Sequence, residues 1–137
     1  MLSARDLFEL RRAGLPVCVP AGLGSSFVVD GIEAEMDAEW GGSYRIVFRG
    51  PGGQWVMVEA AAGGVGDVFP GASTEEFTHP VFGESAVEFY DPGSEPVDFR
   101  SRWMRGDQEF PVFSVAGGGL SVSDAVYLAR SLQVVDA

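Results

Sequence analysis

The sequence predicts an α+β fold in which an antiparallel sheet of about five to seven strands carries an N-terminal and a C-terminal helix packed on one face. Several stretches alternate apolar and polar residues with a period of two, which is typical of half-buried strands. Short turns rich in glycine and proline separate these stretches, which excludes βαβ units and a parallel sheet. Helical patterns with cap residues occur only near the two ends of the chain.

Two short helices are expected. The first spans residues 3–12, where Ser3 and Asp6 have the spacing of a capping box and Gly14 ends the helix. The second follows Ser121, and its apolar residues fall on one helical face: Val122, Ala125, Val126, Ala129 and Leu132. A helix this short is unstable alone, so its apolar face is expected to pack on the sheet.

The clearest strand signals lie in the first half of the chain. A short strand is expected at residues 17–19, and a longer one at 27–36, in which Gly31 marks a β-bulge. Residues 44–49 and 55–61 alternate on either side of a Pro-Gly-Gly turn, which predicts a hairpin.

The second half contains weaker strand signals. A short strand is expected within residues 77–82, and another over 84–90. Residues 99–104 and 110–115 flank a turn and predict a second hairpin. The three consecutive glycines at 117–119 are expected to form a flexible break before the C-terminal helix.

Size and hydropathy describe one globular unit. The 137 residues fit a single domain spanning 1–137, and the hydrophobic content of 46% is enough for a core. The N-terminal segment lacks the apolar stretch of a signal peptide, and no apolar run approaches the roughly 18 residues of a membrane span. We therefore expect a cytoplasmic protein. Cys18 is the only cysteine, so no disulfide forms within the chain.

The chain is strongly acidic. Its net charge is −11, from 20 acidic residues against nine basic ones, and all nine are arginine. This balance argues against nucleic acids and anionic membranes as partners, because both need positive charge at the contact. It permits a basic protein partner, a cationic ligand or high solubility alone.

No catalytic set is evident. His79 is the only histidine and is expected to be a loop residue, since no nucleophile motif accompanies it. One histidine and one cysteine cannot form a common zinc site. Glu59 and Glu88 lie mid-strand, so a pair of carboxylates facing one another for hydrolysis is an alternative hypothesis. We assign no catalytic residue, no cofactor and no metal ligand from the sequence.

Two acidic stretches and one glycine-rich stretch have residue types that occur in ligand sites. The acidic stretches contain Glu33, Glu35, Asp37 and Glu39 in one case, and Asp91, Glu95 and Asp98 in the other. Both have the oxygen ligands that calcium uses, but neither matches an EF-hand, and a solvated strand face is favoured. Residues 62–67 are rich in glycine but precede no helix, so a wide turn with positive φ is favoured over a phosphate loop.

The candidate binding residues are two tryptophans and three arginines. Trp40 lies in an expected loop, and Trp103 lies among Arg100, Arg102 and Arg105, the densest basic segment. Exposed tryptophans often anchor interfaces, although they also cap cores. Arginine suits bidentate carboxylate or phosphate contacts, but ion pairs with the acidic strand faces are the simpler interpretation.

Two resemblances add to this interpretation. Residues 17–23 (VCVPAGL), 44–50 (YRIVFRG) and 59–66 (EAAAGGVG, after Gln54) resemble a family of small uncharacterised cyanobacterial proteins. Residues 120–125 (LSVSDA), leading to 129–132 (ARSL), are similar to the end of a sheet-plus-helix domain attached to some bacterial anti-sigma and lipoprotein sequences. The resemblances imply this fold and relatives that work at or outside the membrane. They imply no activity.

The sequence thus favours a non-catalytic acidic binding or protein-interaction module. The alternatives are a carboxylate-dependent hydrolase and a calcium-binding domain. The expected partner is an unidentified protein, and a homodimer through a sheet edge is a further possibility because open edges are templates for strand pairing.

Overall fold

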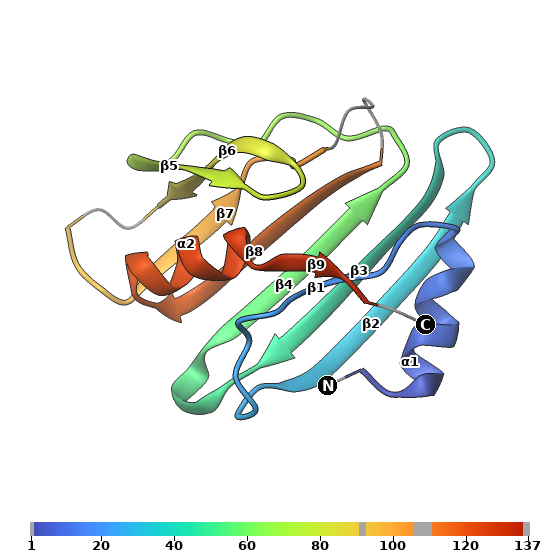
Figure 1. Ribbon diagram of the computed structural model, residues 1–137, viewed down its shortest axis with the longest axis horizontal. Helices are drawn as coiled ribbons and strands as arrows, with labels where there is room; N and C mark the ends of the chain where they lie inside the picture. Colours follow the sequence, from blue (N-terminus) through green and yellow to red (C-terminus); the bar gives the residue numbers. More distant parts are fainter. Residues whose placement is uncertain (1, 91–92, 106–110, 136–137) are drawn as a thin grey trace.

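The computed structural model describes residues 2–90, 93–105 and 111–135, and it has an α+β fold built around a large antiparallel sheet (Figure 1). In spatial order the seven strands are β2 (Val28–Asp37), β3 (Gly41–Arg49), β4 (Trp55–Ala61), β8 (Val112–Leu120), β7 (Val97–Ser101), β6 (Gly83–Phe89) and β5 (Ser73–His79). A small second sheet pairs β1 (Cys18–Pro20) with β9 (Leu132–Val134). The predicted α+β class and the large antiparallel sheet are confirmed.

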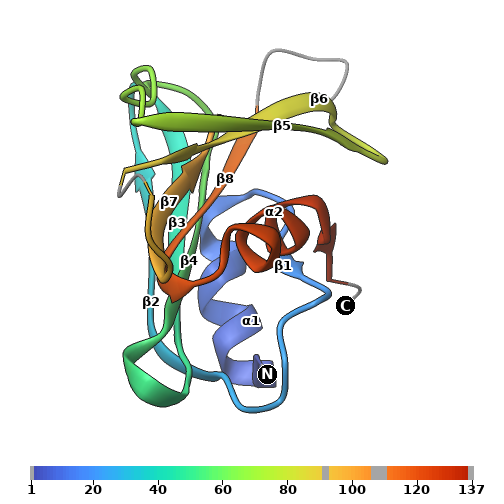
Figure 2. The same cartoon turned by 90° about the vertical axis from the view of Figure 1, so that its left-hand side faces the viewer.

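The helices are α1 (Ala4–Leu10) and α2 (Val122–Arg130), and two short 3-10 turns, η1 (Arg11–Ala13) and η2 (Pro51–Gly53), lie between strands and helices. In Figure 2 both α-helices lie on the same side of the large sheet, and β5 and β6 extend over α2. We call the side of the large sheet that faces the helices the helix side, and we call the opposite side the outer face. None of the helices among the described residues has the length and apolar character needed to cross a membrane.

The core fills the helix side. Tyr44, Ile46 and Phe48 of β3 point there, as do Val56 and Val58 of β4, because alternate residues of a strand face the same way. Leu10 of α1 and Leu128 of α2 are buried against them. The other residues of these strands form the outer face, which no helix covers in Figure 2.

Both helices begin as the sequence indicates. The Ser3 hydroxyl accepts the Asp6 N–H at 3.1 Å, and the Asp6 carboxylate accepts the Ser3 N–H at 3.0 Å, which completes a capping box. The Ser121 hydroxyl accepts the Asp124 N–H at the start of α2. Helix α1 is shorter than the predicted 3–12, because the chain tightens into η1 before Gly14 turns with a φ of 72°.

The first half of the sheet follows the predicted register. Strand β4 has the expected bounds, and the β2–β3 register shifts between Val29 and Gly31, where the bulge was predicted. Strand β4 also pairs with β8, so the two hairpins are neighbours in one sheet. Strand β7 pairs antiparallel with β8, whereas the turn expected between them falls on residues 106–110, outside the described residues.

Two local predictions were wrong, and one short strand was not predicted. Gly117, Gly118 and Gly119 belong to β8 rather than to a flexible break, because Trp55 and the Phe99 ring lie where a side chain at Gly117 or Gly118 would go. Strand β5 begins at residue 73, ahead of the predicted 77, and it ends at 79. Strand β9 was not predicted, because its three residues, which pair with the three residues of β1, are too few for a periodic signal.

Candidate functional site

A row of alternating charges crosses the outer face. Arg45 lies between Glu33 of β2 and Glu59 of β4, with N–O distances of 3.8 and 3.2 Å. Arg100 of β7 reaches the other oxygen of Glu59 at 2.7 Å. Strand β4 lies between β3, which carries Arg45, and β8, which pairs with the strand of Arg100, so both arginines reach the one carboxylate of Glu59. Arg100, the first arginine of the basic segment 100–105, is therefore neutralised within the sheet.

Glu88 continues this row on β6 and is only 2% exposed. Its carboxylate accepts the N–H of Gly71 and the hydroxyl of Thr74, both at 2.9 Å, and pairs with Arg102 at 2.9 Å. The Gly71 N–H, followed by Thr74 and Arg102, lowers the pKa of Glu88 despite its burial. The carboxylate is therefore held ionised. Through its hydrogen bond to Gly71 it fixes the segment between β4 and β5 against the sheet.

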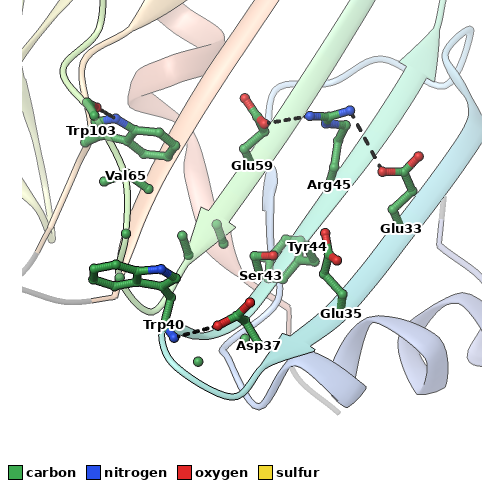
Figure 3. A pocket seen from close by; sticks show the side chains of 17 residues that line it. Glu33, Glu35, Asp37, Trp40, Ser43, Tyr44, Arg45, Glu59, Val65 and Trp103 are labelled. Atoms are coloured by element: carbon green, nitrogen blue, oxygen red, sulfur yellow. Dashed lines mark hydrogen bonds and ion pairs between the residues drawn. The ribbon is translucent and has the colours of Figure 1, made fainter.

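A groove of about 390 Å³ opens on the outer face beside this row. Figure 3 shows Trp40, Val65 and Trp103 on one side of it. The opposite side is β2, which contributes three carboxylates at alternate positions: Glu33, Glu35 and Asp37. Ser43 and Ala61 lie between the two sides. We call this site the tryptophan groove.

The aromatic side of the groove is held by hydrogen bonds and by glycine. The indole N–H of Trp103 donates to the Gly66 carbonyl at 2.8 Å. Gly64, with a φ of 73°, approaches the Trp40 ring so closely that a Cβ would lie 2.9 Å from ring atoms. Trp40 nevertheless remains 56% exposed. The glycine-rich segment 62–67, predicted as a wide turn, thus contacts both tryptophans on the aromatic side of the groove.

The acidic side carries an excess of negative charge. The Asp37 carboxylate accepts the N–H groups of Trp40 (2.9 Å) and Glu39 (2.7 Å), and these bonds lower the pKa of Asp37. The Glu35 side chain is exposed, and its carboxylate makes no hydrogen bond or ion pair within the part of the chain that the structure describes. Among the described residues, four carboxylates and the Arg45 guanidinium line the groove, and Arg100 also pairs with one of the four, Glu59, so the carboxylates outnumber the two guanidinium groups.

The structure places the five candidate binding residues in two groups. Trp40 and Trp103 line the same groove. Arg100 and Arg102 are engaged by Glu59 and Glu88, and Arg105 lines a smaller pocket with Trp103. The sequence analysis considered Glu35 only as a calcium ligand and Val65 only as part of the glycine-rich stretch, and it grouped neither with the tryptophans. The sequence feature that could have indicated this site is the row of alternating acids in residues 33–37, which ends three residues before Trp40. This spacing places carboxylates and an aromatic ring close together at one hairpin.

Glu59 and Glu88 do not face one another. Both lie on the outer face, but β8 and β7 separate their strands. Three strand spacings of about 4.8 Å put them roughly 14 Å apart along the sheet, beyond the roughly 9.5 Å of inverting glycosidases. Each is also paired with arginine, so neither is arranged as a proton donor.

His79 is a buried strand residue, not the loop residue that was expected. It ends β5, is 2% exposed, and its Nδ1 accepts the N–H groups of Val81 and Phe82 at 3.0 and 3.1 Å. Its Nε2 lies 2.8 Å from the Leu132 carbonyl, so the proton resides on Nε2 and donates there. Both ring nitrogens are occupied by structural bonds, which leaves neither free to activate a nucleophile.

Cys18 and Tyr44 form a second buried polar contact, on the helix side. The Tyr44 hydroxyl donates to the Pro16 carbonyl at 2.8 Å and accepts the Cys18 N–H at 2.9 Å. Burial raises the pKa of the Cys18 thiol to about 12 and also raises the pKa of Tyr44. The thiol is therefore protonated and unreactive in the folded chain.

Neither acidic stretch forms a calcium site in the described residues. No group of three histidine, cysteine, aspartate or glutamate side chains there is arranged to hold a metal ion. Glu95 instead accepts the Val122 N–H at 2.7 Å, and Asp98 is engaged in the fold. Asp91 lies outside the described residues.

A scan against protein-family models finds no match, and searches of curated proteins and of solved structures find none either. The two resemblances noted in the sequence therefore stay predictions.

Proposed function

We propose that this chain is a non-catalytic binding module that holds a cationic group of a protein partner in the tryptophan groove. The observation that carries the proposal is that tryptophan rings line one side of the groove and carboxylates line the other, including Glu35, whose side chain has no partner among the described residues. A cation in this position gains from the faces of the rings and from the excess negative charge together.

A guanidinium group suits the groove best. It is planar, it stacks on tryptophan, and it donates two parallel hydrogen bonds to a carboxylate. Trp40 offers an exposed ring, and Glu35 offers a carboxylate with no competing partner among the described residues. An ammonium group would gain the charge attraction but less of the stacking.

The engaged state of the other chemical groups supports binding rather than catalysis. His79, Glu59 and Glu88 are each occupied by hydrogen bonds or ion pairs that hold the fold. Catalysis through them would require breaking structural contacts, whereas binding in the groove uses only its exposed surface.

The test is an NMR titration of the protein with acetyl-Gly-Arg-Gly amide at low salt. The indole N–H signals and the backbone signals of residues 33–40 are expected to shift, and the peptide with citrulline in place of arginine is expected to have little effect. The two peptides have nearly the same shape and differ in charge.

Two variants sharpen the test. Glu35→Gln and Trp40→Leu are each expected to weaken binding about two- to fivefold, since exposed ion pairs and cation–π contacts contribute about 0.5–1 kcal/mol. Glu75→Gln on β5 removes the same charge far from the groove and should leave the affinity unchanged. Equal binding of the arginine and citrulline peptides would refute the proposal.

A further inference from the structure

We propose that the partner presents its cationic groups on an extended basic segment that pairs, as an added strand, with the free edge of β2. This inference rests on the proposed function and names the partner that the tryptophan groove takes. In this arrangement, backbone hydrogen bonds between the partner segment and β2 position the cationic side chains, in addition to the attraction of charge.

The edge of β2 is open over most of its length. Strand β2 is the outermost strand beside β3, and the bulge at Val29–Gly31 leaves residues 31–37 as a regular stretch. Helix α1 lies on the helix side of the sheet in Figure 2, and in the described chain no backbone hydrogen bond joins it to β2. Alternate N–H and C=O groups of this stretch therefore point away from the sheet, which is a template for another strand.

The side chains of the edge carry a regular charge pattern. Glu33, Glu35 and Asp37 recur at every second residue, all face outward, and all line the tryptophan groove. Their spacing is about 7 Å, twice the rise per residue of a strand. A partner strand with a cation at every second residue has the same repeat, so each cation would stand beside one carboxylate.

Charge argues for a basic partner and against a second copy of this chain. Antiparallel pairing of β2 with its own copy would set this row of acids beside an identical row, which is unfavourable. The other free edge, β5, carries Glu75 and Glu76 and repels a copy in the same way. An arginine-bearing strand meets the β2 edge with opposite charge, and its outward-facing side chains lie beside Glu33, Glu35 and Asp37.

The experiment compares three peptides by NMR and tryptophan fluorescence. The parent is acetyl-Thr-Arg-Thr-Arg-Thr-Arg-Thr amide. One derivative is N-methylated at the threonines and the other at the arginines, so charge and composition are kept while one set of backbone donors is removed. In a paired strand only one of these sets faces β2.

The parent is expected to bind, and one N-methylated derivative is expected to lose at least tenfold in affinity while the other binds within about threefold of the parent. Glu35→Gln should weaken the parent peptide about two- to fivefold, and Glu75→Gln should not. The amide signals of residues 31–37 should shift and become protected from exchange.

Each contrary outcome has a separate meaning. Equal binding of all three peptides overturns strand pairing but leaves a cation-binding groove in place. Failure of the heptapeptide while acetyl-Gly-Arg-Gly amide still binds also overturns this inference alone. Failure of both probes overturns the proposed function as well. A dimer in sedimentation, with the amides of residues 31–37 protected in the free protein, assigns the edge to a second copy and overturns the basic-partner inference.

Discussion

Removing the carboxylate of Glu88 should destabilise the fold more than any other single charge change on the outer face. The substitution Glu88→Ala leaves the Gly71 N–H, the Thr74 hydroxyl and the Arg102 guanidinium without their shared acceptor. The substitution Glu88→Gln keeps an oxygen for the first two groups and loses the charge that Arg102 requires.

The expected magnitudes follow from these contacts. Breaking a buried ion pair by deleting one partner costs about 3–5 kcal/mol, and the lower end applies because the Arg102 side chain is 59% exposed and regains water. We therefore expect a loss of about 3 kcal/mol for the alanine variant and about 1 kcal/mol for the glutamine variant. For a chain of this size these losses correspond to falls in Tm of roughly 10 °C and 4 °C.

The pH dependence has a defined sign. The pKa of Glu88 is lower in the folded protein than in the unfolded chain, where it is about 4.3. Its stabilising contribution is therefore complete above the unfolded pKa and is lost as the pH falls toward the folded pKa. The difference in unfolding free energy between wild type and Glu88→Gln should shrink from pH 7 to pH 3.

The assay is urea unfolding followed by far-UV circular dichroism at several pH values. Glu76→Gln on neighbouring β5, an exposed residue of the same charge, is the matched control and should be nearly neutral at pH 7. Equal losses for the alanine and glutamine variants, or a wild-type advantage over Glu88→Gln that does not change with pH, would refute this account of the carboxylate.

Two further predictions concern buried groups away from the groove. His79→Phe should lower the unfolding free energy by about 2–3 kcal/mol in urea titrations, because the buried Leu132 carbonyl loses its donor; it should leave arginine-peptide binding intact, and lost binding without lost stability would contradict a structural role. Burial raises the pKa of the Cys18 thiol to about 12, so this thiol should not react with Ellman's reagent at pH 8 until the protein is denatured. Immediate labelling of the native protein would contradict its burial.

Much of the local structure could be predicted from the sequence, because it depends on neighbouring residues. The period-two pattern located β3 and β4, the spacing of Ser3 and Asp6 located the start of α1, and Gly31 marked the bulge. The local prediction that failed at residues 117–119 depended on residues far away in the chain. The glycines of β8 look like a break in isolation, and they are strand residues because distant Trp55 and Phe99 occupy the space above them.

The candidate site was only partly visible in the sequence. Trp40 and Trp103 stood out, but 62 residues separate them in the chain, and nothing local indicated that they line one groove. Arg100 looked like part of a free basic patch until the pairing of β4 with β8 set it against Glu59. His79 looked like a loop residue until the turn after α2 brought the Leu132 carbonyl to its ring.

The sequence by itself determined the fold class, the two helices, the first hairpin and the acidic character of this protein. These follow from periodicity, capping and charge, which act over a few residues. Only the tertiary structure decided which charges neutralise one another, which carboxylate of the groove stays unengaged among the described residues, and which aromatic rings share a groove. The physical reason is that strand order and register bring together side chains far apart in the chain, and a pairing contact of that kind leaves no trace in local sequence.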